Sequence, residues 1–308
     1  MNELPQAALG RTGLEVTRIG FGAMELRGPH ADAAGRRGAL ALLNAVLDEG
    51  INFIDTSPDY GESEALIGEA LAGRRDEFLL ASKCGCPTGS DAERVMDAHA
   101  HDYSRANVRR GVEDSLRRLR TDRLDLVQVH LSPSRAELER LGTVDELRRL
   151  QQEGKVRFIG MSGTLPHLVD HIAIGCFDVF QVPYSLLEPA HDAAIAQAAA
   201  AGAGVVVRGS VWRGKPFFRR GRGDRLVGAL RRLVGRPDQW QALGLDALRG
   251  EMPVREFLLR FTLSHPGQST TIVGTSRLEH LRANVEAARK GPLPPELLAH
   301  VRRALMRA

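Results

Sequence analysis

The chain has 308 residues, of which 43% are hydrophobic and 26% are charged, and its formal net charge is +4. This composition is typical of a soluble globular protein and excludes a disordered chain. The charge is too small to indicate nucleic-acid binding by itself. No run of 18 apolar residues occurs, so we expect neither a transmembrane helix nor a membrane partner.

The N-terminus and the cysteines bear on the cellular location. Residues 1–10 lack the order of a secretory signal, in which a basic segment precedes an apolar one. The chain has three cysteines, Cys84, Cys86 and Cys176. They are too few for a disulfide framework, and the spacing of the first two is not that of a metal or redox motif. We therefore expect reduced thiols, a cytoplasmic protein and no metal site.

Short apolar runs alternate along the chain with longer amphipathic segments. The runs suit buried strands of a parallel sheet, and they are 18–22, 51–54, 78–82, 124–129, 156–161, 179–182, 204–207 and 270–273. The amphipathic segments have the spacing of helices, and they are 38–48, 64–72, 104–119, 144–152, 165–174, 190–201, 254–264 and 278–288. Eight strands that are each followed by a helix predict a closed (β/α)8 TIM barrel.

The remaining segments complete one predicted domain over residues 1–308. Residues 6–17 read as a β-hairpin before the barrel at 18–290, and residues 294–307 as an extra C-terminal helix. A doubly wound sheet is the alternative fold, but no strand is followed by the Gly-x-Gly-x-x-Gly fingerprint. Residues 208–251 form a long excursion whose Arg-rich part, 213–236, is either a solvated loop or a flap that meets a phosphate-bearing ligand.

Four reactive side chains fall where a β/α barrel carries its chemistry, at the C-terminal ends of strands. Asp55, Lys83 and His130 directly follow three neighbouring predicted strands, and Tyr60 lies in the loop after the first of them. Each alone has an ordinary structural alternative: a turn cap, an ion pair, a hydrogen-bonded core histidine or a loop aromatic. Together they predict a catalytic site, and we call them the rim residues.

The rim residues are suited to protonating a carbonyl oxygen. A tyrosine has a reference pKa of about 10, and we expect the Lys83 ammonium to lower the pKa of Tyr60. Asp55 would pair with Lys83, and His130 would orient the carbonyl oxygen beside the phenol. No side chain supplies a hydride, so this chemistry requires a nicotinamide cofactor over the barrel mouth.

Over essentially its whole length, the sequence resembles the aldo-keto reductases. The similarity is carried by the stretches 50–61 (GINFIDTSPDYG), 82–83 (SK), 116–126 (LRRLRTDRLDL) leading to His130, 154–162 (GKVRFIGMS), 181–185 (QVPYS), and 272–276 (IVGTS) followed by Asn284. The catalytic Asp, Tyr, Lys and His of that family fall on Asp55, Tyr60, Lys83 and His130. The resemblance implies reduction of aldehydes or ketones by NADPH, with NADH as the alternative.

The resemblance also implies a set of cofactor contacts. They are Gly22, Ala23, Met24, Asp55, Ser162, Gln181, Arg208, Gly209, Ser210, Val211, Gly274, Thr275, Ser276, Arg277, His280, Arg282 and Asn284. Within this set Ser162 and Gln181 would hold the nicotinamide carboxamide, while Gly163 stands where the family usually has Asn. Arg277 and Arg282 either bind the 2′-phosphate of NADPH or are ordinary exposed helix charges. His280 occupies the position at which the family has the Arg that clamps this phosphate.

The substrate pocket would be lined by Met24, Tyr60, Leu131 and Trp212, which favours a hydrophobic carbonyl compound. Two other functions remain open at this point. One is a non-catalytic barrel that binds nicotinamide and regulates a partner. The other is an isomerase or lyase that uses Lys83 as a Schiff base. The barrel needs no partner for its core, so we expect a monomer.

Overall fold

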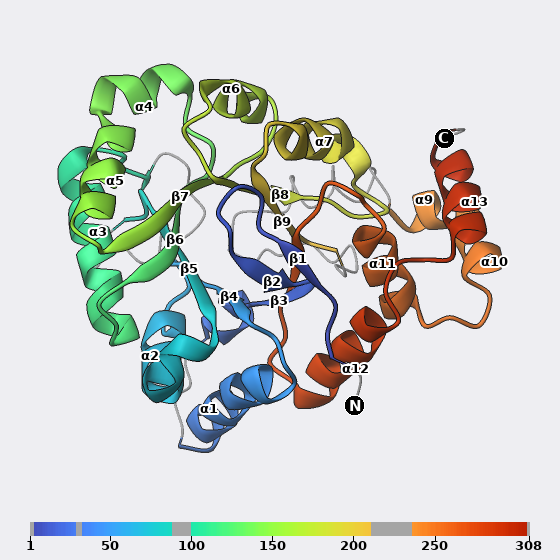
Figure 1. Cartoon of the computed structure of the whole chain (residues 1–308). Coiled ribbons are helices and arrows are strands. Elements are labelled where there is room, and N and C mark those ends of the chain that lie inside the picture. The colour runs from blue at the N-terminus through green and yellow to red at the C-terminus, as the bar shows by residue number, and fades with distance from the viewer. Residues whose placement is uncertain (1–2, 29–32, 88–99, 211–235, 307–308) are drawn as a thin grey trace, which may run out of the picture.

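The computed structural model describes residues 3–28, 33–87, 100–210 and 236–306. Eight parallel strands close into a barrel in the order β10-β3-β4-β5-β6-β7-β8-β9, with the helices outside it (Figure 1). The strands are β3 Ile19–Gly22, β4 Phe53–Asp55, β5 Leu79–Cys84, β6 Leu124–His130, β7 Val156–Ser162, β8 Val179–Pro183, β9 Gly204–Arg208 and β10 Thr270–Val273. The first and last barrel strands pair in parallel, Thr271 opposite Ile19. This closure confirms the predicted (β/α)8 barrel and excludes the doubly wound sheet.

The helices match the predicted order. They are α1 Ala33–Asp48, α2 Ser63–Leu71, α3 Arg105–Leu119, α4 Arg135–Leu141, α5 Thr143–Gln152, α6 His167–Ile174, α7 Asp192–Ala200, α9 Arg236–Ala242, α10 Leu245–Arg249, α11 Val254–Leu263, α12 Leu278–Arg289 and α13 Pro295–Met306. Short 3₁₀ helices are η1 Ala23–Leu26, η2 Ala72–Glu77 and η5 Pro189–His191. The helix α13 lies outside the barrel, as predicted for residues 294–307.

Three helices were not predicted from periodicity. Helix α4 buries only Leu138, so it has no apolar stripe to detect; its N-cap is Ser134, whose side chain accepts a hydrogen bond from the Glu137 amide. Helices α9 and α10 lie in the long excursion after β9. Residues 213–235 of the Arg-rich stretch lie outside the described residues, and so do Val211 and Trp212.

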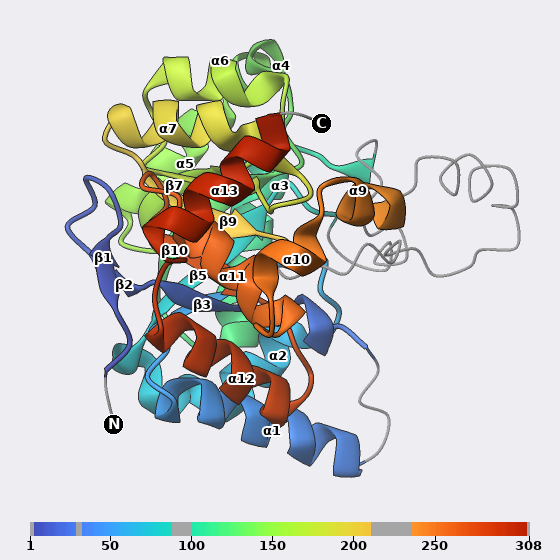
Figure 2. The ribbon, with the colours of Figure 1, turned by 90° about the vertical axis from the view of Figure 1, so that its right-hand side faces the viewer.

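The predicted hairpin closes one end of the barrel. Strands β1 Gln6–Ala8 and β2 Glu15–Thr17 pair antiparallel, and Figure 2 shows them at the left end of the barrel. Gly10 bridges to Ala203, just before β9. Only a residue without a side chain fits here, because a Cβ on Gly10 would lie 2.1 Å from the Gly204 nitrogen. The hairpin therefore covers the N-terminal ends of the strands.

The interior of the barrel below the hairpin is apolar. Leu9 and Val16 of the hairpin segment join side chains from the strands in one buried cluster, whose strand members are Phe53, Ala81, Leu126, Val179, Val206 and Ile272. Burying such a side chain stabilises the fold by about 1.5–3 kcal/mol. A larger cluster fills the space between the strands and the helices. The interior of the barrel at this end is thus a packed apolar plug.

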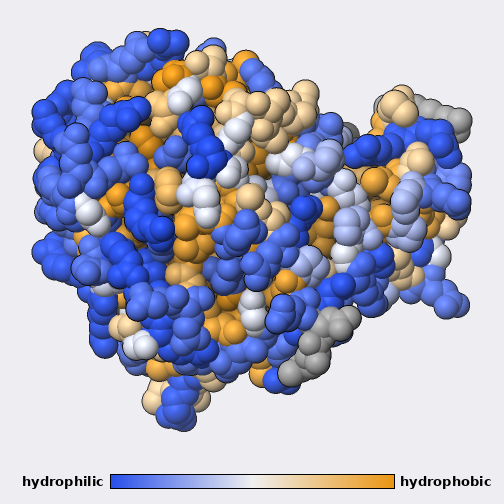
Figure 3. All heavy atoms as spheres, viewed as in Figure 1, coloured by the Kyte–Doolittle hydropathy of each residue, from blue (hydrophilic) through white to orange (hydrophobic). Residues whose placement is uncertain are grey.

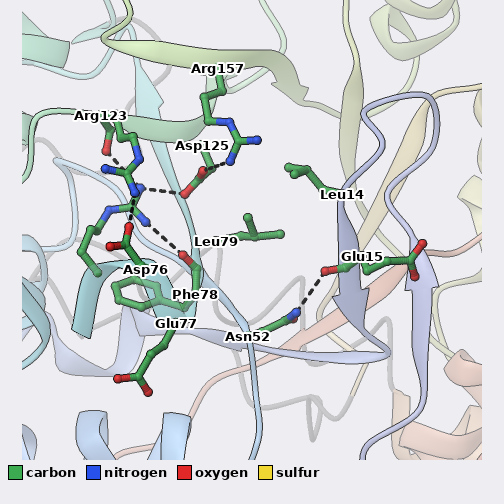
Figure 4. Close-up of a pocket in the computed structure, with 11 residues that line it drawn as sticks. Leu14, Glu15, Asn52, Asp76, Glu77, Phe78, Leu79, Arg123, Asp125 and Arg157 are labelled. Atoms are coloured by element: carbon green, nitrogen blue, oxygen red, sulfur yellow. Dashed lines mark hydrogen bonds and ion pairs between the residues drawn. The ribbon is translucent and has the colours of Figure 1, made fainter.

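A charged recess of about 200 Å³ lies at the same N-terminal end (Figure 4). Asp125, at the start of β6, accepts hydrogen bonds from Arg75 at 2.7 Å, from Arg157 at 2.8 Å and from the Leu80 amide at 2.9 Å. These contacts tie the starts of β5, β6 and β7 together. Because its carboxylate and arginines pair with one another, the recess serves the stability of the barrel, as polar groups at this end usually do.

The outer helices are largely polar. In the face shown in Figure 3, hydrophilic side chains cover much of the surface, with smaller apolar areas between them. Within the described ranges, no helix is long and apolar enough to cross a membrane.

Candidate active site

The C-terminal ends of β4 and β5 bring Asp55 and Lys83 into contact. The Lys83 Nζ atom lies 2.6 Å from Asp55 Oδ1 and 2.9 Å from the Thr56 carbonyl oxygen. The two side chains are 0% and 1% exposed, so their charges compensate each other away from water. A buried charge pair of this kind is held in one geometry, because losing either partner would leave the other charge uncompensated.

Two buried amides complete the surroundings of Asp55. Gln128 and Gln181 each donate a hydrogen bond to Asp55 Oδ1 at 2.9 Å. Ser162 in turn donates to Gln181 Oε1 at 2.9 Å, so the predicted carboxamide contacts Ser162 and Gln181 lie in the same network as the ion pair. Gln128 was missed from the sequence. Its signal was present, since it precedes His130 by two residues and therefore points to the same face of β6.

Tyr60 lies beside this network and is buried. The Lys83 Nζ atom is 5.7 Å from the centre of the phenol ring. Burial raises the pKa of Tyr60 and the negative charge of Asp55 raises it further, whereas the Arg208 guanidinium lowers it. The expected lowering of this pKa by Lys83 is therefore wrong, because burial dominates and Asp55 compensates the ammonium. The phenol remains protonated at neutral pH.

Arg208 ends β9 and is half-buried next to the rim residues. Burial lowers its pKa, while the nearby Tyr60 and Asp55 side chains act in the opposite direction. The guanidinium therefore faces the same space as the phenol and the carboxylate. The structure thus places the predicted nicotinamide-stacking residue at the barrel mouth.

His130, at the end of β6, is buried and neutral. Burial lowers its pKa to about 4, although the hydrogen bond with Asp59 raises it. Its Nδ1 atom lies 3.2 Å from Asp59 Oδ2 and 3.4 Å from Cys86 Sγ. His101 contacts the same carboxylate oxygen at 3.3 Å. Asp59, Cys86 and His101 were not predicted as site residues, because they come from two loops, the β4–α2 and β5–α3 connections, whose approach no sequence spacing reveals.

The predicted cofactor residues gather around the mouth from opposite sides of the barrel. Gly22 ends β3, and Ala23 and Met24 follow in η1. A Cβ on Gly274 would lie 3.1 Å from the Gly22 carbonyl oxygen, so the loops after β3 and β10 are adjacent. Gly209 and Ser210 follow β9, and Thr275 and Ser276 follow β10.

Two of these residues have buried polar atoms without partners. Within the described residues, neither Ser210 Oγ nor the Asn284 amide oxygen and nitrogen make a hydrogen bond. Leaving a buried polar group unpaired costs about 1–3 kcal/mol. A polar ligand along this side of the mouth would satisfy these atoms, so the residues present fit a dinucleotide.

The candidate phosphate residues of α12 are less specific. Arg282 pairs with Glu49, with 3.0 Å between Nε and Oε1. Arg277 pairs with Glu279, and both side chains are exposed. His280 is half-buried in the first turn. In this conformation the two arginines match the alternative of exposed helix charges.

Leu131 of the predicted substrate pocket has an unusual backbone. Its φ is +63° and that of Ser132 is +54°, a left-handed conformation that non-glycine residues adopt rarely. Such conformations persist where surrounding contacts impose them, and they gather at functional sites. Ser132 Oγ accepts a hydrogen bond from the Thr164 amide at 2.7 Å, which fixes the turn directly after His130.

Comparison with known proteins gives a consistent result over nearly the whole chain. The aldo/keto reductase family model matches residues 18–305. Pyridoxine 4-dehydrogenase of Escherichia coli is 31% identical, over 92% of this chain and 93% of its own length. The uncharacterized oxidoreductase YqkF of Bacillus subtilis is 26% identical over 97% of both chains. The holo form of aldo-keto reductase AKR11C1 from Bacillus halodurans has a TM-score of 0.81 at 29% identity, over 98% of this chain and 96% of that one.

Proposed function

Because this chain belongs to the aldo/keto reductase family and is thereby an oxidoreductase, we propose that it reduces an aldehyde or ketone with NAD(P)H. The observation that carries the proposal is the buried Asp55–Lys83 pair beside the protonated Tyr60 phenol, with the neutral His130 on the neighbouring strand. Tyr60 is the proton donor. NADPH is the proposed cofactor, with NADH as the alternative.

Each rim residue has a separate task in this reaction. The Tyr60 hydroxyl donates its proton to the carbonyl oxygen as negative charge develops there. His130 is neutral, so it orients that oxygen by a hydrogen bond and contributes no net charge. Asp55 holds Lys83 against β4, and Gln128 and Gln181 hold Asp55. Bound nicotinamide supplies the hydride.

The proposed cofactor residues follow the mouth of the barrel. Ser162 and Gln181 would hold the carboxamide, and Arg208 would stack on the ring. Gly274, Thr275 and Ser276, before the first turn of α12, would meet a phosphate through backbone amides. Ser210 and Asn284 would use the polar atoms that lack partners in the described residues.

The Schiff-base alternative is disfavoured by the surroundings of Lys83. Its nitrogen is buried and donates to a carboxylate and to a carbonyl oxygen. A lysine that forms a Schiff base must instead present a free amine to its substrate. The regulatory alternative is disfavoured by the complete set of rim residues, which a barrel that only binds nicotinamide does not require.

The test combines cofactor titration with a substrate panel. NADPH and NADH are titrated by fluorescence, and their oxidation is followed with aromatic and aliphatic aldehydes and ketones. Turnover with at least one hydrophobic carbonyl compound is expected. Tight cofactor binding without turnover on the whole panel would favour the regulatory barrel, and trapping of a substrate on Lys83 by borohydride would favour the Schiff-base enzyme.

A further inference from the structure

Four ligand-type side chains meet behind the rim of the barrel, on the side of β4, β5 and β6. They are Asp59, Cys86, His101 and His130, all of them buried, and one ligand atom from each lies within 4.8 Å of the others. We call them the four-residue cluster. Asp59 comes from the loop after β4, Cys86 and His101 both come from the connection between β5 and α3, and His130 ends β6. Nothing in the proposed reduction requires the first three.

Three distances within the cluster are close to those between neighbouring ligands of one small ion. His130 Nδ1 lies 3.2 Å and His101 Nε2 lies 3.3 Å from Asp59 Oδ2, and Cys86 Sγ lies 3.4 Å from His130 Nδ1. Ligands at Zn²⁺ bond lengths of about 2.0–2.3 Å stand roughly 3.3–3.8 Å apart at tetrahedral angles. The three separations are thus close to those that one zinc ion imposes on its ligands.

Both imidazoles of the cluster contact the same oxygen of Asp59. His101 Nε2 lies 3.3 Å and His130 Nδ1 lies 3.2 Å from Asp59 Oδ2, so three ligand-type atoms already meet at one point. A metal ion among the four atoms would take the place of the protons that these contacts now share.

The ligand atoms of the four residues indicate which metal ion the site would bind. One thiolate, two imidazoles and one carboxylate form a mixed S, N and O set, which suits Zn²⁺ and does not suit Ca²⁺ or Mg²⁺. The charges also balance, because a thiolate and a carboxylate neutralise a divalent ion in a buried site. We propose that Asp59, Cys86, His101 and His130 form a structural zinc site.

The loops that carry the ligands are joined to one another. The Asp102 amide donates to the Gly85 carbonyl oxygen at 3.0 Å, and Asn107 Nδ2 donates to the carbonyl oxygens of Cys86 and Asp102 at 3.2 and 2.7 Å. The Tyr103 hydroxyl donates to the His130 carbonyl oxygen at 2.6 Å. Backbone next to Cys86, His101 and His130 is therefore held in register, which a preformed metal site requires.

The zinc site has a consequence for catalysis that rests on the proposed function. A neutral imidazole whose Nδ1 binds a metal carries its proton on Nε2. His130 would then be fixed as a hydrogen-bond donor on its other nitrogen, which is the role proposed for it toward the carbonyl oxygen. In this role Asp59, Cys86 and His101 are positioning residues.

The site is tested by metal content, independently of activity. Tag-free protein from zinc-supplemented medium is desalted and its zinc measured by mass spectrometry, and Co²⁺ is then substituted. About one zinc per chain is expected, and cobalt should give a thiolate charge-transfer band together with the intense visible bands of a tetrahedral site. In Cys86→Ser the charge-transfer band should disappear, and in His101→Gln zinc should fall well below one per chain.

The control is Cys176→Ser, which removes a thiol outside the cluster and should keep full zinc content. Two results would overturn the site. One is a parent protein that holds less than one zinc per chain even after ZnCl₂ is added and the sample is desalted. The other is that Cys86→Ser and His101→Gln both bind as much zinc as the parent. Folding of each variant is checked by circular dichroism. A protein that holds zinc but reduces no carbonyl compound would leave the site intact and refute only the proposed function.

Discussion

The buried ion pair at the barrel mouth allows a quantitative test. Asp55→Asn leaves the Lys83 ammonium buried without a counter-charge, and Lys83→Met leaves the Asp55 carboxylate with only amide donors. Removing one partner of a buried pair costs about 3–5 kcal/mol. We take about 3 kcal/mol for each single variant, because Gln128, Gln181 and the Thr56 carbonyl oxygen remain as partial partners.

The double variant Asp55→Asn/Lys83→Met separates pairing from packing. It removes both charges, so neither is left uncompensated, and its cost should be about 3 kcal/mol rather than the additive value of about 6 kcal/mol. The coupling energy is then about 3 kcal/mol. Urea unfolding at pH 7, followed by circular dichroism and tryptophan fluorescence, measures all four proteins of the cycle.

The matched control is a surface pair. Lys155 contacts Glu113 with 2.7 Å between Nζ and Oε1, but the two side chains are 30% and 40% exposed. Exposed pairs contribute about 0–1 kcal/mol, so Lys155→Met should change the free energy of unfolding by less than about 1 kcal/mol. Additive costs of the Asp55 and Lys83 variants, or costs as small as that of the control, would refute the reasoning.

Three further predictions concern the scaffold. Asp125→Asn should lower the free energy of unfolding by about 2–4 kcal/mol, because it leaves two arginines of the N-terminal recess without their shared carboxylate; the exposed Asp122→Asn should be nearly neutral in the same urea titration. Gly68→Ala should be destabilising by about 2 kcal/mol or more, since its Cβ would lie 2.3 Å from the Arg118 carbonyl oxygen. Gly38 lies in α1 with open space around it, so Gly38→Ala should instead stabilise the protein by about 0.5–1 kcal/mol. Equal effects of Gly68→Ala and Gly38→Ala in thermal unfolding would contradict the packing of α2 on α3. Burial lowers the pKa of His171, so as the pH falls His171 takes up a proton in the unfolded chain before it does so in the folded protein. The free energy of unfolding should therefore fall as the pH drops below about 6.5. This fall should be shallower in His171→Gln, and identical slopes in the two proteins would exclude His171 as a contributor.

The fold was predictable because its signal is local and repeated. Each strand is a short buried run and each covering helix has an apolar face, as in α3, where Val108, Val112 and Leu119 are buried. Closure followed from the number of strand–helix units. Helix α4 was missed for the opposite reason, since a helix that buries one leucine leaves no periodic pattern.

The site was only partly predictable. Asp55, Lys83 and His130 lie at strand ends, and the barrel itself brings strand ends together, so sequence position was enough to group them. Asp59, Cys86 and His101 meet only through the paths of two loops. The pKa of Tyr60 also depends on burial and on Arg208 from the far side of the barrel, and neither can be read from the residues near Tyr60 in the chain.

The role of Tyr60 is tested most directly by steady-state reduction kinetics of Tyr60→Phe, with the NADPH dissociation constant measured on the same sample. Phenylalanine keeps the ring and removes the proton. We predict that kcat/KM falls by about 10²–10⁴-fold, while NADPH binding is nearly unchanged. A variant that reduces its carbonyl substrate at the rate of the parent would show that the proton comes from elsewhere.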